Sequence, residues 1–160
     1  MIRVLGLGSP FGDDRIGWAP AEAAGRADAG LDVRLCAHAG EVLCALLSPV
    51  DRIIVVDGMR SGAAPGTWRR ISPEMLRAQG AALSSHSTDL SQALAMIEAL
   101  DAAHAPVTVF AVEVDKTGPL DVMTSALVAA VPQVVEAILA EAQAVISMRL
   151  PSGSSTTLSD

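Results

Sequence analysis

The chain has 160 residues, of which 51% are hydrophobic, and a formal net charge of −7. This length accommodates one domain with a sizeable core and is too short for two, so a single site is expected. The acidic balance, with no basic cluster beyond Arg69–Arg70, argues against nucleic acid or anionic lipid as a partner. A cationic or metal-bearing partner fits better.

The apolar stretches are interrupted by glycine, proline and charged residues and fall well below the ~20 residues needed to span a bilayer. The N-terminal segment lacks the apolar core and cleavage site of a signal peptide. We therefore expect no membrane insertion and a cytoplasmic protein. Cys36 and Cys44 have no metal-type spacing and form no disulfide framework, so both are expected to be reduced thiols in the core.

Predicted strands and helices alternate through the first half of the chain. A strand over residues 2–6 is followed by a helix over 14–29, a strand over 32–37, a helix over 40–47 and a strand over 52–56. The strands are nearly continuous apolar runs rich in Val, Ile and Leu. Such runs are typical of strands that are buried on both faces of a sheet.

The second half contains one strand of a different kind. Residues 66–71 alternate polar and apolar side chains, which predicts an edge strand that can run antiparallel. Helices are predicted over 72–78, 88–102 and 124–145, with a further strand over 106–114.

This order of elements predicts a single-domain, three-layer α/β/α fold, phosphorylase/hydrolase-like, with a five-stranded and mostly parallel sheet. Trp68 is expected to face inward from the edge strand, and Pro132 to kink or break the last helix. Residues 1–146 form the predicted domain. Residues 147–160 have almost nothing to bury and are expected to be a disordered tail.

The turn after the first strand carries two adjacent acids, in the stretch GSPFGDDRIG over residues 8–17. It lacks the third glycine of a dinucleotide fingerprint, and two carboxylates would repel a pyrophosphate. Helix capping is one explanation for Asp13, because carboxylates are favoured at helix N-termini. For Asp14, a role in a binding or catalytic site is favoured by the residues expected to lie near it.

Asp57 follows the predicted strand 52–56, and ligands of open parallel sheets bind at the carboxyl ends of the strands. With strand order 2-1-3, Asp14 and Asp57 would converge on one crevice. His86 opens a predicted helix and is either a third polar group at this rim or a capping or solvated histidine. Two carboxylates and an imidazole form an open coordination shell for a borderline ion such as nickel or zinc.

These residues resemble the hydrogenase maturation proteases. The resemblance is carried by Val4–Gly8 leading to Gly12–Gly17, by Ile54–Asp57, by Ser61–Thr67 and by Ser85–His86 before a helix. No single motif is specific, but they occur in order over nearly the whole chain. The metal-binding positions of that family fall on Asp14, Asp57 and His86, which the resemblance also implies as catalytic residues.

The resemblance implies an endopeptidase that removes the C-terminal extension of a nickel-iron hydrogenase large-subunit precursor after nickel insertion. Nickel in the precursor would be the recognition element, with zinc or cadmium as other possible ions. One hypothesis is that the metal polarises the scissile carbonyl or a water, while Asp14 or Asp57 positions that water as general base. We expect the protein to be a monomer.

The chain departs from the family after the second strand, where an Asp-Gly-Gly-Thr-like stretch is usual and Leu35–Gly40 stands here. His38 is either an added polar group at the crevice or a packed residue, and His38 and Gly40 are candidate substrate-binding residues. Two other functions remain open: a non-catalytic module that checks nickel loading, and a phospho-receiver with Asp57 and Lys116 in its site.

Overall fold

The computed structural model describes residues 1–79, 85–114 and 121–148, without the side chains of residues 79 and 85–88. Within this part of the chain, five strands form one sheet in the order β2-β1-β3-β5-β4. The strands are β1 (Ile2–Leu7), β2 (Leu31–Cys36), β3 (Arg52–Met59), β4 (Trp68–Ile71) and β5 (Val107–Glu113). The helices are the 3-10 helix η1 (Gly12–Ile16) and α1 (Trp18–Ala27), α2 (Ala39–Leu47), α3 (Pro73–Gln79), α4 (Ser85–Ala99) and α5 (Ser125–Ser147).

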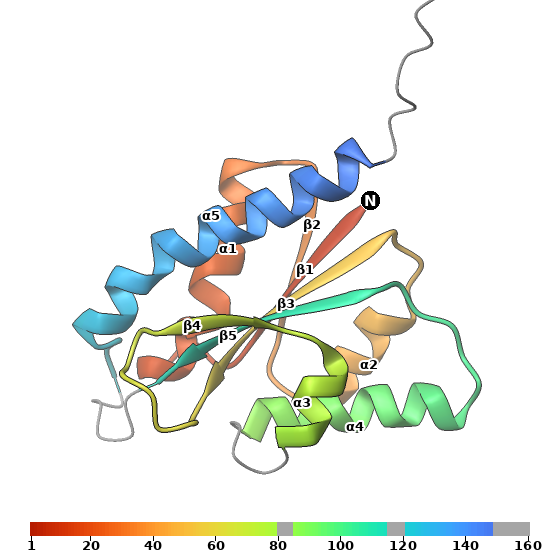
Figure 1. Cartoon of the computed structure of the whole chain (residues 1–160), viewed down its shortest axis with the longest axis horizontal. Coiled ribbons are helices and arrows are strands. Elements are labelled where there is room, and N and C mark those ends of the chain that lie inside the picture. The colour runs from red at the N-terminus through yellow and green to blue at the C-terminus, as the bar shows by residue number, and fades with distance from the viewer. Residues whose placement is uncertain (80–84, 115–120, 149–160) are drawn as a thin grey trace, which may run out of the picture.

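Helices cover both faces of the sheet, with α1 and α5 on one face and α2, α3 and α4 on the other (Figure 1). Side chains along a strand point alternately to the two faces. In β3, Ile53 and Val55 therefore join the core under α2 and α4, and Ile54 and Val56 join the core under α1 and α5. The predicted three-layer α/β/α architecture is confirmed, and burial on both faces explains the continuous apolar strands.

The strands β1, β2, β3 and β5 are parallel, and β4 pairs antiparallel with β5 at the edge. The predicted antiparallel edge strand is thus confirmed, over Trp68–Ile71 instead of residues 66–71. Trp68 is partly buried on the α5 side, where its ring meets Phe110 edge-on at 5.9 Å and its indole N–H donates to Gln133 Oε1 at 3.3 Å. We call the sheet edge where β1, β3 and β5 end the carboxyl edge.

Several element boundaries differ from those predicted. The helix expected over 14–29 is divided into η1 and α1 at Gly17, where an added Cβ would lie 1.8 Å from the Leu7 carbonyl oxygen. The chain is pressed against β1 at this point, which interrupts a regular helix. β3 continues to Met59 because β5 still pairs with it there, and α4 begins at Ser85 and ends at Ala99.

Helix α5 runs through Pro132 without a break, so of the two predicted outcomes, a kink or a break, the break is wrong. Pro132 is exposed, and the carbonyl that loses its helical partner there can be hydrated. The helix is long and apolar enough to cross a membrane, but Leu127, Val134 and Ile138 are buried against the sheet, as in a core helix. It ends at Ser147, and residues 149–160 of the predicted tail lie outside the described residues.

Candidate active site

The acidic turn folds back onto the end of β1. Gly8 and Gly12 have φ angles of 147° and 50°, a region that favours glycine. A Cβ at Gly8 would lie 2.1 Å from the Asp14 carbonyl oxygen, and the Ser9 N–H donates to that oxygen at 3.4 Å. The turn therefore needs glycine at position 8, and it places Asp14 at the carboxyl edge.

The two acids of the turn have different surroundings. Asp13 Oδ1 accepts a hydrogen bond from the Thr124 N–H at 2.7 Å, and its Oδ2 accepts one from the Thr124 hydroxyl at 3.2 Å. Thr124 is the N-cap of α5, where the helix has unsatisfied N–H groups. Asp13 thus caps a helix, as the alternative for this residue proposed, although the helix is α5 and not the one that follows the turn.

Asp57 lies inside β3 and not after it, since the strand continues through Gly58 and Met59. Its backbone pairs with Ala111 of β5, and the residue is 2% exposed. Alternation along β3 directs Asp57 to the same face as Ile53 and Val55, the face covered by α4. Asp57 is thus a buried acidic side chain near the carboxyl edge, the place where ligands of open parallel sheets bind, and it stays a functional candidate.

The elements that carry Asp14 and Asp57 are in contact. A Cβ at Gly58, the residue after Asp57, would lie 3.4 Å from Ile16 Cγ2, and Ile16 ends η1. β1 and β3 are neighbours in the sheet, as the predicted order 2-1-3 requires. The convergence of the two carboxylates on one crevice stays a prediction, because it depends on where their side chains meet a substrate.

His86 lies in the first turn of α4, and its side chain is outside the described residues. Because α4 leads into β5, which is parallel to β3, this helix begins at the carboxyl edge (Figure 1). Among the side chains that the structure describes, no group of three or more His, Cys, Asp and Glu could hold a metal ion. The predicted triad includes His86 and therefore stays a prediction.

His38 precedes α2 at the end of edge strand β2, with its side chain 68% exposed. The possibility that it is a packed residue is therefore wrong. Its Nε2 lies 3.6 Å from Glu41 Oε1, and Glu41 also accepts a hydrogen bond from the Ala37 N–H at 2.6 Å. Gly40 is exposed in the first turn of α2, so both residues are accessible to a partner at this corner.

One buried carboxylate at the carboxyl edge, that of Glu113, was not predicted from the sequence. This residue ends β5, is 2% exposed and accepts hydrogen bonds from residues at the start of the β3–β4 loop. The available signal was an acidic residue near the carboxyl end of a buried apolar run, which is also what indicates Asp57.

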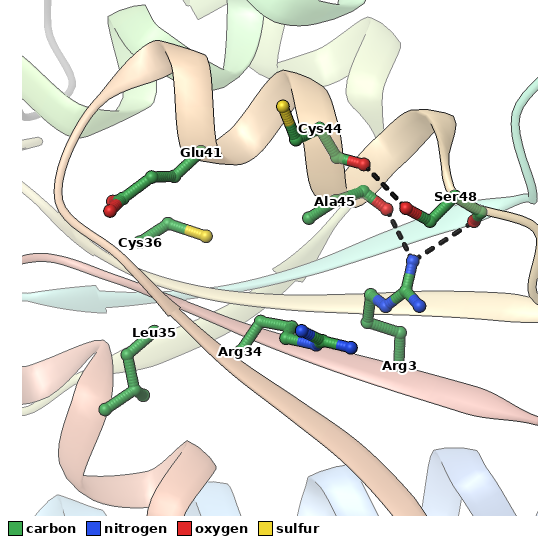
Figure 2. A pocket seen from close by; sticks show the side chains of 8 residues that line it. All are labelled: Arg3, Arg34, Leu35, Cys36, Glu41, Cys44, Ala45 and Ser48. Carbon is green, nitrogen blue, oxygen red and sulfur yellow. Dashed lines mark hydrogen bonds between the residues drawn. The ribbon is translucent and has the colours of Figure 1, made fainter.

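The two thiols have different environments, and Figure 2 shows them on the wall of a pocket of about 280 Å³ between β2 and α2. Cys36 is buried, and desolvation, assisted by the negative charge of Glu41, raises its pKa to about 11. Cys44 is exposed, so the prediction of a core thiol is wrong for this residue. Val42 and Leu46 define the buried stripe of α2, and Cys44 lies between them on the opposite side of the helix.

A groove of about 460 Å³ opens beside the acidic turn, between η1 and the first turns of α5. Pro10 and Gly12 form part of one wall, and Val128, Val131 and Pro132 part of the other. Arg15 and Asp121 supply charge at its rim. The groove therefore offers mostly apolar contacts next to η1, the helix that contains Asp14.

Comparison with known proteins gives a consistent result. The sequence model of one family, HycI, described as hydrogenase maturation protease, matches residues 38–141. None of the curated proteins compared with the chain matches it.

Two solved structures illustrate the similarity of fold. The hydrogenase maturating endopeptidase HybD from E. coli has a TM-score of 0.74 and 22% identity, over 89% of this chain and 92% of its own. The hydrogenase maturation protease HybD from Thermococcus kodakarensis has a TM-score of 0.71 and 23% identity, over 89% of this chain and 98% of its own.

Proposed function

Because the chain belongs to the hydrogenase maturation protease family, we propose that it removes the C-terminal extension of a nickel-iron hydrogenase large-subunit precursor once nickel has been inserted. The observation that supports this most is the family match over residues 38–141, which includes Asp57 and His86. The turn with Asp14 lies before that range. It is supported by the fold shared with the two HybD structures over 89% of the chain.

In this proposal nickel is part of the substrate. The carboxylates of Asp14 and Asp57 and the imidazole of His86 would hold it, since oxygen and nitrogen ligands of this kind suit a borderline divalent ion. The metal would supply Lewis acidity toward the scissile carbonyl. The acidic carboxyl edge is consistent with a cationic group in the partner.

The residues of the chain would provide the remaining chemistry of hydrolysis. Asp57 is buried and held in β3, and Asp14 is partly exposed at the end of a constrained turn. One of the two carboxylates would accept a proton from the attacking water, whose oxygen bonds to the carbonyl carbon as the C–N bond breaks. The proton then passes to the leaving amine. The groove beside η1 would take apolar side chains of the precursor.

The proposal is tested by measuring the mass of a nickel-loaded large-subunit precursor after incubation with wild-type protein and with His86→Ala. Loss of a single C-terminal peptide with the wild type, dependent on nickel and absent with His86→Ala, is the expected result. His104→Ala is the matched control, because His104 is an exposed histidine before β5 at the opposite edge of the sheet. It should process normally.

An unchanged mass with every cognate precursor would contradict the peptidase proposal. Nickel-dependent binding without cleavage would then identify a module that inspects nickel loading. Phosphorylation of Asp57 by acetyl phosphate would instead support a receiver, although the antiparallel β4 is foreign to that class and Lys116 lies outside the described residues. We expect the protein to act in the cytoplasm as a monomer.

A further inference from the structure

The carboxylate of Glu113 is held by three hydrogen bonds from one short segment. Its Oε2 accepts from the Ser61 N–H at 3.0 Å and from the Ser61 hydroxyl at 2.7 Å. Its Oε1 accepts from the Gly62 N–H at 2.8 Å. Both oxygens are thus bound to the first residues of the loop that follows β3.

The segment bound by Glu113 begins directly beyond the part of β3 that carries Asp57. In the described pairing, β1 accompanies β3 only as far as Val56, whereas β5 pairs with Asp57, Gly58 and Met59. The end of β3 is therefore supported on the β5 side. Glu113 is the register partner of Met59, the last residue of β3. Beyond this pair, its side-chain carboxylate takes the place of a strand carbonyl as the acceptor for the N–H groups of Ser61 and Gly62.

The carboxylate is suited to this role because it is charged. Burial alone would raise the pKa of Glu113, but the hydrogen bonds from Ser61 and Gly62, together with the charge of Arg69, outweigh burial and lower the pKa. An ionised carboxylate makes stronger hydrogen bonds to N–H and O–H donors than a neutral acceptor does.

The geometry of the strand is consistent with an effect on Asp57. Glu113 lies on the same face of the sheet as Ala111, the register partner of Asp57. The backbone between Asp57 and the clamped Ser61 is short. A shift of this segment would reach Asp57 directly, and small displacements of reacting groups are expensive in rate.

We propose that Glu113 is a positioning residue, which clamps the start of the β3–β4 loop and so holds the end of β3 that carries Asp57. The inference rests on the proposed peptidase function for its kinetic consequence. It assigns to Glu113 no contact with the substrate.

The kinetic test compares Glu113→Gln and Glu113→Ala with Glu141→Gln, a matched control. Glu141 is also a hydrogen-bonded carboxylate, but it joins α5 to Arg52 at the start of β3 and to Arg70 of β4, away from the carboxyl edge. We expect kcat for precursor cleavage to fall roughly tenfold or more in Glu113→Gln and further in Glu113→Ala, with KM changed less than about threefold. Glu141→Gln should retain kcat when assayed below its melting temperature.

The second test is amide hydrogen exchange, which does not depend on cleavage. Exchange over residues 57–62 should be about tenfold faster or more in Glu113→Gln and unchanged there in Glu141→Gln. Unchanged exchange over this segment would overturn the inference. An equal loss of kcat in Glu113→Gln and Glu141→Gln would overturn the inference as well, because Glu113 would then matter only for overall stability.

The two tests separate the proposals. If the wild type cleaves no precursor, the proposed function fails, and hydrogen exchange alone decides whether Glu113 holds the Asp57 segment. If the wild type cleaves but the Glu113 variants keep full kcat, the function stands and the positioning role is overturned.

Discussion

At the scale of single residues, the adjacent acids Asp13 and Asp14 should respond differently to the same change. Asp13→Ala removes both hydrogen bonds to Thr124 and should lower the free energy of unfolding by about 1–2 kcal/mol, the usual cost of a lost helix cap. Asp14→Ala should abolish processing and leave the fold intact. Urea unfolding and the precursor mass measurement check the two results. The assignment is wrong if Asp14→Ala is the variant that unfolds and Asp13→Ala the one that loses activity at full stability.

At the scale of elements, the joint between β1, η1 and α1 depends on close backbone contact. Gly17→Ala would place a Cβ 1.8 Å from the Leu7 carbonyl oxygen, so the joint must move, and we expect a loss of about 3 kcal/mol or more in the free energy of unfolding. Gly40→Ala is the matched control: its nearest contact would be His38 Nδ1 at 3.4 Å, in an exposed helical turn. It should gain about 0.5–1 kcal/mol in urea unfolding. A higher KM for precursor in this stable variant would support substrate binding at Gly40, and an equal loss in both variants would contradict the steric argument.

At the scale of the whole molecule, Glu141 joins helix α5 to three strands through Arg52, Arg70 and the Thr108 hydroxyl. Burial would raise its pKa, but these hydrogen bonds outweigh burial and hold the pKa at about 2, against 4.5 ordinarily. Because the pKa is lowered on folding, the stabilisation is complete above about pH 4.5 and is lost as the pH falls toward 2. Glu141→Gln should therefore cost about 1–3 kcal/mol at pH 7 in urea unfolding, with a smaller deficit at pH 3. Glu136→Gln, exposed on the same helix, should cost little, and a pH-independent deficit in Glu141→Gln would contradict the assignment.

Much of this organisation could be predicted from local sequence pattern. Continuous apolar runs identify strands buried on both faces, and the alternation around Trp68 identifies an antiparallel edge strand. The same runs point to Asp57, since an acid at the end of such a strand is conspicuous. The family that the chain resembles is confirmed by the family match, whereas the roles of Asp14, Asp57 and His86 stay predictions.

What could not be predicted depends on contacts between distant segments or on helical phase. Asp13 caps a helix whose N-cap, Thr124, lies 111 residues away, and no local pattern indicates that pairing. Glu113 is bound by a loop that lies 52 residues before it in the sequence. Cys44 has an apolar side chain but faces outward, because the buried face of α2 is the one that carries Val42 and Leu46.

The position of Thr124 and Glu113 late in the chain has a consequence for biosynthesis. Both acids of the turn and Asp57 leave the ribosome early, whereas Thr124, which donates to Asp13, and Glu113, which clamps the Asp57 segment, are synthesised later. The strand β5 must also insert between β3 and β4 after both have emerged. A nascent chain that has not extended past Thr124 therefore lacks an assembled carboxyl edge, so any activity of this edge would have to await the synthesis of that residue.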